Sequence, residues 1–482
     1  MNFDSVSGEM LKGSLTSYGA ETIVGYEDAM TQFDVQTNRW AATENNANNS
    51  WNCNFNNGNF NNNNNKNNSM RVRPVVAYDI PEDFLSLVFA AFEDCCKNKR
   101  TSKACIDYCE IASQDLPLLA YELYTGTYQP GISTCFLVKY PKYREVFAAC
   151  FRDRIVHHFL YLLLNPLFEA RFEAQGNVSF NCRKGYGTLA AQQAAYDAIR
   201  HATNNYRAKA WVYRGDLVSF FMSIDKRILW TKLEPFIRKT YKGKYMSIVL
   251  NITRIVVFHC PEKLCVFNTD TAEWAKHVES HKSLFGNDAY HGMPIGNLTT
   301  QVFANFLMSY FDDYVITWMR SHGQPVYYVR FVDDFVIVCR DKALLKLMIK
   351  DFRSYLQTEL HIQLHADKFH FQPASHGLLF VGAYLKNYRI YLSNRTFARF
   401  KERVHGFKTM LENKQVVTYA DICRIEQVLN SYLGFCKIKR TYARRKQLLL
   451  TFDHTFYKYF YIDGHYERVK IKSKTKPQFL AA

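Results

Sequence analysis

The sequence predicts a mixed fold of helices and strands, either α/β or α+β, from two kinds of pattern. Three segments have the β-branched and aromatic composition of strands: "AWVYRGDLVSFFMSID", "PVYYVRFVDDFVIVCR" and "GLLFVGAYLKNYRIYL". Between the first two lie helical patterns such as "TTQVFANFLMSYFDDYVITWMRSH". One apolar stripe runs along that helix through Val302, Phe303, Phe306, Leu307 and Tyr310. Strands that alternate with helices in this way exclude an all-helical bundle.

Length and charge favour a multidomain protein that binds nucleic acid. With 482 residues, 48% of them hydrophobic, the chain is long enough for two or three domains with their own cores. Its formal net charge of +17 predicts a polyanionic partner, because Lys and Arg neutralise phosphates and release counterions. The longest apolar run, "FLYLLLNPLF", is about half as long as a membrane-spanning helix. The N-terminus does not resemble a secretory signal, so we expect a cytoplasmic protein without a membrane partner.

The thirteen cysteines are scattered and include no C-x2-C pair. The closest are the adjacent Cys95 and Cys96, followed by Cys105 and Cys109. This spacing predicts neither a disulfide framework nor a zinc site. We expect reduced thiols that pack as small hydrophobic side chains.

Composition changes sharply near residue 75. Of the 24 residues 45–68, 16 are asparagine, which predicts either a loop or a lectin-like strand-and-loop fold with a few large core residues. The segments "EDFLSLVFAAFEDCCKNK" and "LPLLAYELYTGTY" that follow have helical periodicity. The C-terminal stretch "YERVKIKSKTKPQFLAA" is basic, and we expect a tail that contacts nucleic acid.

Two adjacent aspartates, Asp333 and Asp334, are predicted at the tip of an apolar hairpin. Neighbouring carboxylates repel each other unless a cation lies between them, and Mg²⁺ prefers such oxygen ligands. Asp216, at the end of another strand, is the candidate third carboxylate. This set suits two-metal phosphoryl transfer, with two Mg²⁺ ions or with Mn²⁺ as a substitute. The alternative for the pair alone is an exposed turn without a ligand.

A glycine-containing loop, "SFNCRKGYGT", combines backbone freedom with positive charge. Arg183, Lys184 and Gly185 are candidates for contacting a template phosphate backbone. The alternative is a plain basic loop, because a lone Gly-x-Gly is weak evidence.

Several of these motifs, in this order, resemble reverse transcriptases. "FVDDF" is similar to the family's Y-x-D-D box, "RGDLVSFFMSID" to the strand with its first metal-binding aspartate, and "GMPIGNLTTQVFAN" to its nucleotide pocket. "LLFVGAYL" resembles the primer grip. The resemblance implies an α+β right-hand polymerase fold with fingers, a palm of antiparallel sheet plus helices, a helical thumb and an Asn-rich N-terminal extension. It divides the chain into an extension (1–78), N-terminal helices and fingers (79–210), palm (211–392, with a fingers segment at about 235–290), thumb (393–465) and basic tail (466–482).

The resemblance also implies roles for individual residues. Asp216, Asp333 and Asp334 match the catalytic carboxylates, and Lys368 in "LHADKFHF" matches a lysine proposed as general acid for pyrophosphate. The positions that match metal ligands are Asp216, Leu217, Asp333 and Asp334. Those that match the dNTP site are Lys142, Arg144, Phe220, Phe221, Ile295, Gly296 and Gln301; Phe221 would be the aromatic gate against a ribose 2′-OH. Those that match template or primer contacts are Arg183, Lys184, Gly185, Asn297, Phe331, Val381 and Gly382.

Within that family, the chain resembles the enzymes of diversity-generating retroelements. Most reverse transcriptases have Pro-Gln-Gly where this chain has Pro294-Ile295-Gly296, and the Ile-Gly-Asn run is similar to this group. Thr300 and Phe331 depart from the Ser and Tyr that are usual there. The resemblance implies a bacterial or phage-encoded enzyme that copies a template-repeat RNA into cDNA with errors opposite adenine, together with a small basic accessory protein. The alternatives are a phage-defence or retron-like reverse transcriptase, a C-type-lectin-like binding protein, or an inactive RNA-binding palm.

The same resemblance offers a cause for the asparagines. Template repeats of these elements carry adenine-rich codons at positions meant to vary, and such codons spell asparagine. "SWNCNFNNGNFNNNNNKNNSMRVRPV" also resembles the C-terminal end of the lectin-fold proteins that the elements diversify. On this hypothesis, residues up to about 75 are unmutated template with little catalytic role. A low-complexity linker is the alternative.

Overall fold

The computed structural model describes residues 79–139, 142–325, 327–366, 369–437, 439, 441–473 and 475, together with the backbone of three strands between residues 38 and 65. These strands are β1 (Asn38–Glu44), β2 (Asn49–Asn54) and β3 (Asn59–Asn65), which form an antiparallel sheet. Part of the asparagine-rich stretch therefore has strand backbone. The chain divides into two compact units, one of residues 1–171 and 219–307, the other of residues 172–218 and 308–482.

The first unit is largely helical. Its helices are α3 (Glu82–Cys96), α4 (Lys103–Cys109), α5 (Ala112–Thr125), α6 (Phe151–Ala174), α8 (Phe220–Ser223), α9 (Lys226–Thr240), α10 (Met246–Phe258), α11 (Thr271–His277) and α12 (Leu298–Ser321), and α6 and α12 continue into the second unit. Aromatic rings fill its core: Phe168 packs against Phe236 and Phe306 at 5.7 and 4.8 Å between ring centroids. The predicted stripe on α12 is buried from Val302 to Leu307, because the spacing of its apolar residues matches the helical repeat.

A three-stranded sheet completes this unit. Its strands are β4 (Ser133–Val138), β5 (Arg144–Ala148) and β7 (Cys265–Phe267), in the order β5-β4-β7. β4 pairs antiparallel with β5 and parallel with β7. Alternate residues of β4 and β5 are buried, which is the pattern of a sheet covered on one face.

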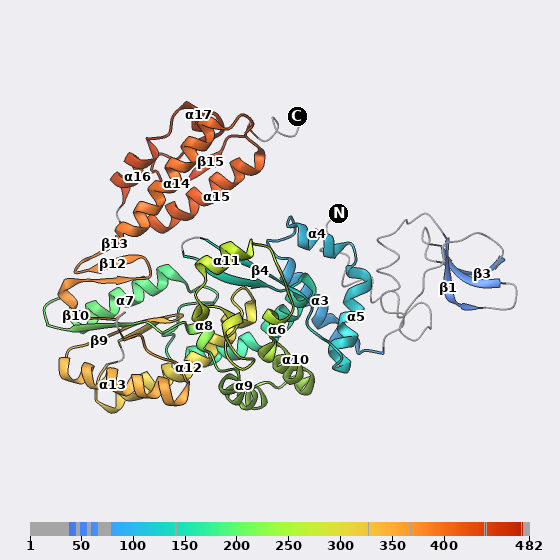
Figure 1. Ribbon diagram of the computed structural model, residues 1–482, viewed down its shortest axis with the longest axis horizontal. Helices are drawn as coiled ribbons and strands as arrows, with labels where there is room; N and C mark the ends of the chain where they lie inside the picture. The colour runs from blue at the N-terminus through green and yellow to red at the C-terminus, as the bar shows by residue number, and fades with distance from the viewer. Residues whose placement is uncertain are drawn as a thin grey trace. The chain divides into compact units, whose positions relative to one another are not determined.

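The second unit contains a four-stranded antiparallel sheet in the order β10-β6-β9-β8. The strands are β6 (Trp211–Gly215), β8 (Tyr328–Phe331), β9 (Asp334–Cys339) and β10 (His370–Pro373). Helices α7 (Thr188–Ala202) and α13 (Lys342–Glu359) lie on opposite sides of it (Figure 1). Val212, Val336 and Val338 belong to the core cluster shared with α7. The alternation of side chains along each strand therefore builds two core layers.

A hairpin and its extension follow: β11 (Leu378–Phe380), β12 (Ala383–Lys386) and β13 (Arg389–Leu392). They lie in "GLLFVGAYLKNYRIYL", the third of the segments with strand-like composition. The mixture of helices with mostly antiparallel sheets confirms the predicted α+β class. No helix among the described residues is long and apolar enough to cross a membrane.

The region predicted as a thumb has its own core. It consists of α14 (Asn394–Asn413), α15 (Tyr419–Lys437), α16 (Tyr442–Leu449), α17 (His454–Tyr459), β14 (Phe460–Ile462) and β15 (Val469–Ile471). The boundary predicted at residue 466 is too early, because β15 pairs with β14 and Val469 is fully buried in this core. The surrounding lysines hid the alternation of Val469 and Ile471 along a strand. Lys439 and Arg445 are also buried in this region.

Candidate metal and nucleotide sites

The three predicted carboxylates lie on two neighbouring strands of the second unit. Asp333 is in the two-residue turn between β8 and β9, and Asp334 is the first residue of β9, because Phe331 pairs with Asp334. On the adjacent strand, Gly215 pairs with Phe335. Asp216 follows Gly215 and is therefore next to Asp334 across the sheet. The hairpin and the neighbouring strand end that the sequence predicts are both present.

The turn that carries Asp333 is strained and held from several sides. Val332 has φ 59°, a left-handed conformation that costs energy for a β-branched residue. Its N–H donates to Asn181 Oδ1 at 2.8 Å, and its carbonyl accepts from Arg330 Nη1 at 3.2 Å. Arg330 is itself bound to Asp312 at 2.6 Å, with both side chains fully buried. Sequence reasoning missed these supporting residues because each lies in a segment that reads as ordinary helix, strand or loop.

Asp334 differs from the other two carboxylates in its partner. Both of its oxygens accept hydrogen bonds at 2.7 Å from Arg214, two residues before Asp216. Burial raises the pKa of Asp334 to about 6, and the nearby Asp333 and Asp216 charges add to this, although Arg214 opposes it. The three carboxylates are therefore close enough to repel one another.

This arrangement fits a divalent cation. A cation between carboxylates relieves their repulsion, and each oxygen of Asp334 keeps a second lone pair while it accepts from Arg214. Asp216, Asp333 and Asp334 are the side chains that would hold it. Leu217 is buried and forms an antiparallel bridge with Leu364, so only its backbone carbonyl suits a cation.

In the first unit, two parts of the predicted dNTP site share strand β5. Arg144 is exposed at the first position of β5. Further along the same strand, the Phe147 N–H donates to the carbonyl of Ile295 at 2.8 Å. Gly296 has φ 131°, and a Cβ there would lie 2.5 Å from the Phe147 carbonyl, so only glycine fits. The Pro-Ile-Gly segment is thus fixed against the strand that carries the candidate triphosphate-binding arginine.

The other predicted dNTP residues also lie in this unit. Phe220 is buried and Phe221 is half-buried, with their rings 5.2 Å apart. The Phe221 carbonyl accepts from Met293 N at 2.8 Å, which ties the aromatic gate candidate to the Pro-Ile-Gly segment. Lys142 and Gln301 are exposed.

Two residues predicted to contact template or primer have structural roles instead. Arg183 is 6% exposed, and its guanidinium donates to the Ser179 carbonyl at 2.9 Å and stacks over the Tyr186 ring at 4.0 Å. Asn297 is 5% exposed, and its Oδ1 accepts from Ala149 N. Both side chains are therefore buried and hydrogen-bonded within the protein. Lys184 and Gly185, in the same loop as Arg183, are exposed.

The predicted primer-grip turn has the expected geometry. Val381 and Gly382 connect β11 and β12 with φ 43° and 79°. The Val381 carbonyl accepts from Gln192 Nε2 at 2.7 Å, which anchors the turn to α7. Phe331 is half-buried and packs against the core cluster that includes Val212, Val336 and Val338. Lys368 lies outside the described residues.

A small pocket next to Asn297 contains a histidine with an unusual pKa. Its lining includes Asp153, His157, His259 and Thr300. His157 Nδ1 lies 2.9 Å from Thr299 Oγ1. Burial lowers the pKa of His157 to about 3, and the positive charge of neighbouring residues adds to this.

Stability should therefore fall on acidification. The unfolded chain takes up a proton on His157 near pH 6.5 and the folded chain only near pH 3, so the free energy of unfolding decreases as pH falls through this window. In His157→Gln, we expect the decrease between pH 6.5 and pH 4.5 to be smaller by about 2 kcal/mol, measured by urea unfolding. His281→Gln, at an exposed position, is the control. Equal pH slopes for wild type and His157→Gln would contradict this assignment.

The chain is similar to several known proteins. A family model described as reverse transcriptase (RNA-dependent DNA polymerase) matches residues 139–385. Protein YkfC of Escherichia coli (strain K12) is 23% identical over 303 residues, which cover 56% of this chain and 70% of YkfC. A solved telomerase from Candida albicans, in complex with a TWJ fragment of telomeric RNA, has a TM-score of 0.40 and 12% identity, covering 72% of this chain and 65% of that one. Apo telomerase from Candida tropicalis, truncated from its C-terminal domain, has a TM-score of 0.40 and 12% identity, covering 63% and 73%.

The grouped carboxylates and the family match define a nucleotidyltransferase that makes polynucleotides. The chain belongs to the reverse transcriptase family, that is, to the RNA-dependent DNA polymerases. Members of this family copy template RNA and generally use divalent metal ions, typically Mg²⁺. A lectin-like binding function for the whole chain is therefore excluded.

Proposed function

We propose that this chain is the reverse transcriptase of a diversity-generating retroelement. It would copy a template-repeat RNA into cDNA with errors opposite adenine, for the diversification of a target gene. The observation that carries this proposal is the Pro294-Ile295-Gly296 segment. Ile295 replaces the glutamine found in most of the family and packs against the apolar cluster that includes Phe147 and Met222. The asparagine-rich stretch is independent support.

The chain's own residues would position the reactants. Bound Mg²⁺ ions at Asp216, Asp333 and Asp334 would activate the primer hydroxyl and stabilise the leaving pyrophosphate. Arg144 presents a planar guanidinium that matches phosphate oxygens in pairs, with Lys142 as a second cation. Phe221 would exclude a ribose 2′-OH by contact. Lys368 remains the proposed proton donor to pyrophosphate.

Nucleic acid would be held by other residues. Lys184, Gly185, Phe331, Val381 and Gly382 stay candidates for template or primer contact. The divisions into fingers (79–210), palm (211–392) and thumb, now extended to at least Ile471, are part of the proposal. A small basic accessory protein is the expected partner of the complex.

Ile295→Gln is expected to lower misincorporation opposite template adenine about fivefold. Glutamine restores an amide next to the nascent base pair, and one hydrogen bond of about 1 kcal/mol corresponds to that factor. The measurement is deep sequencing of cDNA made from one RNA template. Ile295→Leu is the matched control, because it keeps an apolar side chain of the same size and should keep the error spectrum. An unchanged spectrum in Ile295→Gln would refute the role of Ile295.

The diversification role can be tested on the DNA that surrounds the gene. Sequencing of the DNA that flanks the gene should reveal a neighbouring gene with the pattern W-x-C-x-F-x-x-G followed by Arg-Val-Arg-Pro-Val, in which varied residues replace the asparagines. Absence of such a repeat would favour the alternative of a phage-defence or retron-like reverse transcriptase. An inactive RNA-binding palm would instead fail to extend a primer on RNA with dNTPs and Mg²⁺, or with Mn²⁺.

A further inference from the structure

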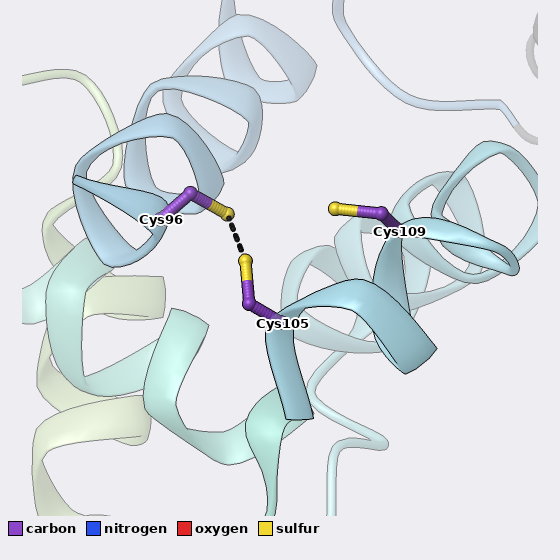
Figure 2. Close-up of side chains that lie close together, drawn as sticks. All are labelled: Cys96, Cys105 and Cys109. Carbon is purple, nitrogen blue, oxygen red and sulfur yellow. Dashed lines mark hydrogen bonds between the residues drawn. The ribbon is translucent and has the colours of Figure 1, made fainter. Parts of the chain in front are cut away.

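Three cysteine thiols converge between two helices of the first unit. Cys96 is the last residue of α3, and Cys105 and Cys109 lie one turn apart on α4, so they share one face of that helix. Figure 2 shows the three sulfurs directed into the same space, with Cys96 and Cys105 joined by a contact of 3.4 Å. All three sulfurs lie within 4.8 Å of one another. Cys96 and Cys105 are buried, and Cys109 is half-buried.

We propose that Cys96, Cys105 and Cys109 bind a thiolate-preferring cation of the Zn²⁺ type through their three sulfurs. A Zn–S bond is about 2.3 Å long, and tetrahedral geometry then separates ligand sulfurs by about 3.8 Å. The observed spacing, from 3.4 Å to no more than 4.8 Å, brackets that value. Small rotations of the side chains would complete the site. The fourth position would face the half-exposed side of Cys109, where water can bind.

A positively charged side chain near the cluster suits the net charge of the proposed site. Three thiolates around a divalent cation carry a net charge of −1, which a nearby cation stabilises. The guanidinium of Arg100, in the connection between α3 and α4, is such a cation near Cys109. Arg100 is also held to α3 by an ion pair with Glu93 at 3.3 Å.

Simple packing and a disulfide explain the cluster less well. If the thiols packed only as small hydrophobic groups, their sulfurs would not need to point toward the same space. A disulfide between Cys96 and Cys105 would use two sulfurs and leave the third without a role. Three converging sulfurs are instead the arrangement of a cation site with one exchangeable position.

The consequence would be structural. The cation would fasten α4 to the end of α3 and fix the basic connection between them, residues 97–102. That connection is exposed and includes Lys97, Lys99 and Arg100. The cysteine spacing, C-x8-C-x3-C rather than C-x2-C, did not predict this site, because the convergence of the sulfurs depends on the angle between two helices.

The test uses the full chain, reduced and freed of metal by dialysis against a chelator, with Zn²⁺ alone and then Co²⁺ alone as probes. We expect one tightly bound Zn²⁺ per chain by elemental analysis, and a rise in melting temperature of at least a few degrees. Co²⁺ should produce the near-ultraviolet charge-transfer absorption of thiolate ligands. Cys105→Ser should lose all three signals.

Two control variants keep the test decisive. Cys95→Ala removes a fully buried neighbouring thiol outside the cluster, and Cys182→Ser removes an exposed one; both should keep one bound Zn²⁺. The Co²⁺ spectrum of the wild type needs no variant to fold, and absence of thiolate charge transfer there would overturn the proposal. Zn²⁺ binding that persists in folded Cys105→Ser would overturn it as well. So would a Cys96–Cys105 disulfide, found by peptide mass, in protein that binds no Zn²⁺.

Discussion

Asp333→Asn is expected to reduce RNA-templated DNA synthesis about a thousandfold or more while the fold is retained. The substitution keeps the shape of the side chain but removes one negative charge from the group formed with Asp216 and Asp334. A bound cation contributes several kcal/mol to the stabilisation of charge in the transition state, and each 1.36 kcal/mol changes the rate tenfold. Asp333 lies in the hairpin turn, so its loss leaves the paired strands β8 and β9 intact.

The measurement is primer extension on an RNA template with dNTPs and Mg²⁺. Asp216→Asn should give a similar loss, because it lies on the neighbouring strand. Asp197→Asn is the control: its carboxylate makes an exposed ion pair with Arg200 at 3.3 Å and accepts from Gln193 Nε2 at 3.0 Å on the same helix, and activity should not change. If Asp333→Asn kept wild-type activity with an unchanged melting temperature, the assignment of the carboxylates to catalysis would be wrong.

The elements around the three candidate catalytic carboxylates were predictable from sequence because their signals are local. The alternating apolar residues that flank Asp333 define both strands of the hairpin, and the run that ends at Gly215 places Asp216 at a strand end. Both follow from the two-residue period of strands. The turn at Gly382 follows from its own conformational freedom.

What could not be predicted depends on which side chains satisfy one another in three dimensions. Composition marked Arg183 as a nucleic-acid contact, yet its hydrogen bonds to Ser179 and Asn177 are made within its own loop. Asn181, in the same loop, holds the Val332 turn of the catalytic hairpin instead. The residue type and its neighbours in sequence are the same for an arginine that is exposed and for one whose guanidinium is already bound. In this loop, Asn181 rather than Arg183 makes the hydrogen bond to the β8–β9 turn.

The second large effect is expected on stability, when the buried ion pair that supports the β8–β9 hairpin is broken. Arg330 and Asp312 are fully buried, with Arg330 Nε 2.7 Å from Asp312 Oδ1, and the Tyr328 hydroxyl donates to the same oxygen at 2.7 Å. Arg330→Met leaves the Asp312 carboxylate buried without its guanidinium partner. We expect the free energy of unfolding to fall by about 3 to 5 kcal/mol, measured in denaturant. Arg238→Met, which breaks an exposed pair with Glu234, should cost at most about 1 kcal/mol.

The double variant Arg330→Met/Asp312→Leu separates stability from positioning. Without a buried unpaired charge, it should regain part of the lost stability, since apolar side chains of similar volume replace buried ion pairs at little cost, although the buried Tyr328 hydroxyl loses its acceptor. It still lacks the Arg330 hydrogen bond to the Val332 carbonyl, which holds the strained turn next to Asp333. DNA synthesis should therefore stay well below wild type, because a side chain displaced by about 1 Å can cost a hundredfold in rate. A double variant as unstable as Arg330→Met would show that the ion pair is not what stabilises this region. A stable double variant with full activity would show that Asn181 alone is sufficient to position the turn.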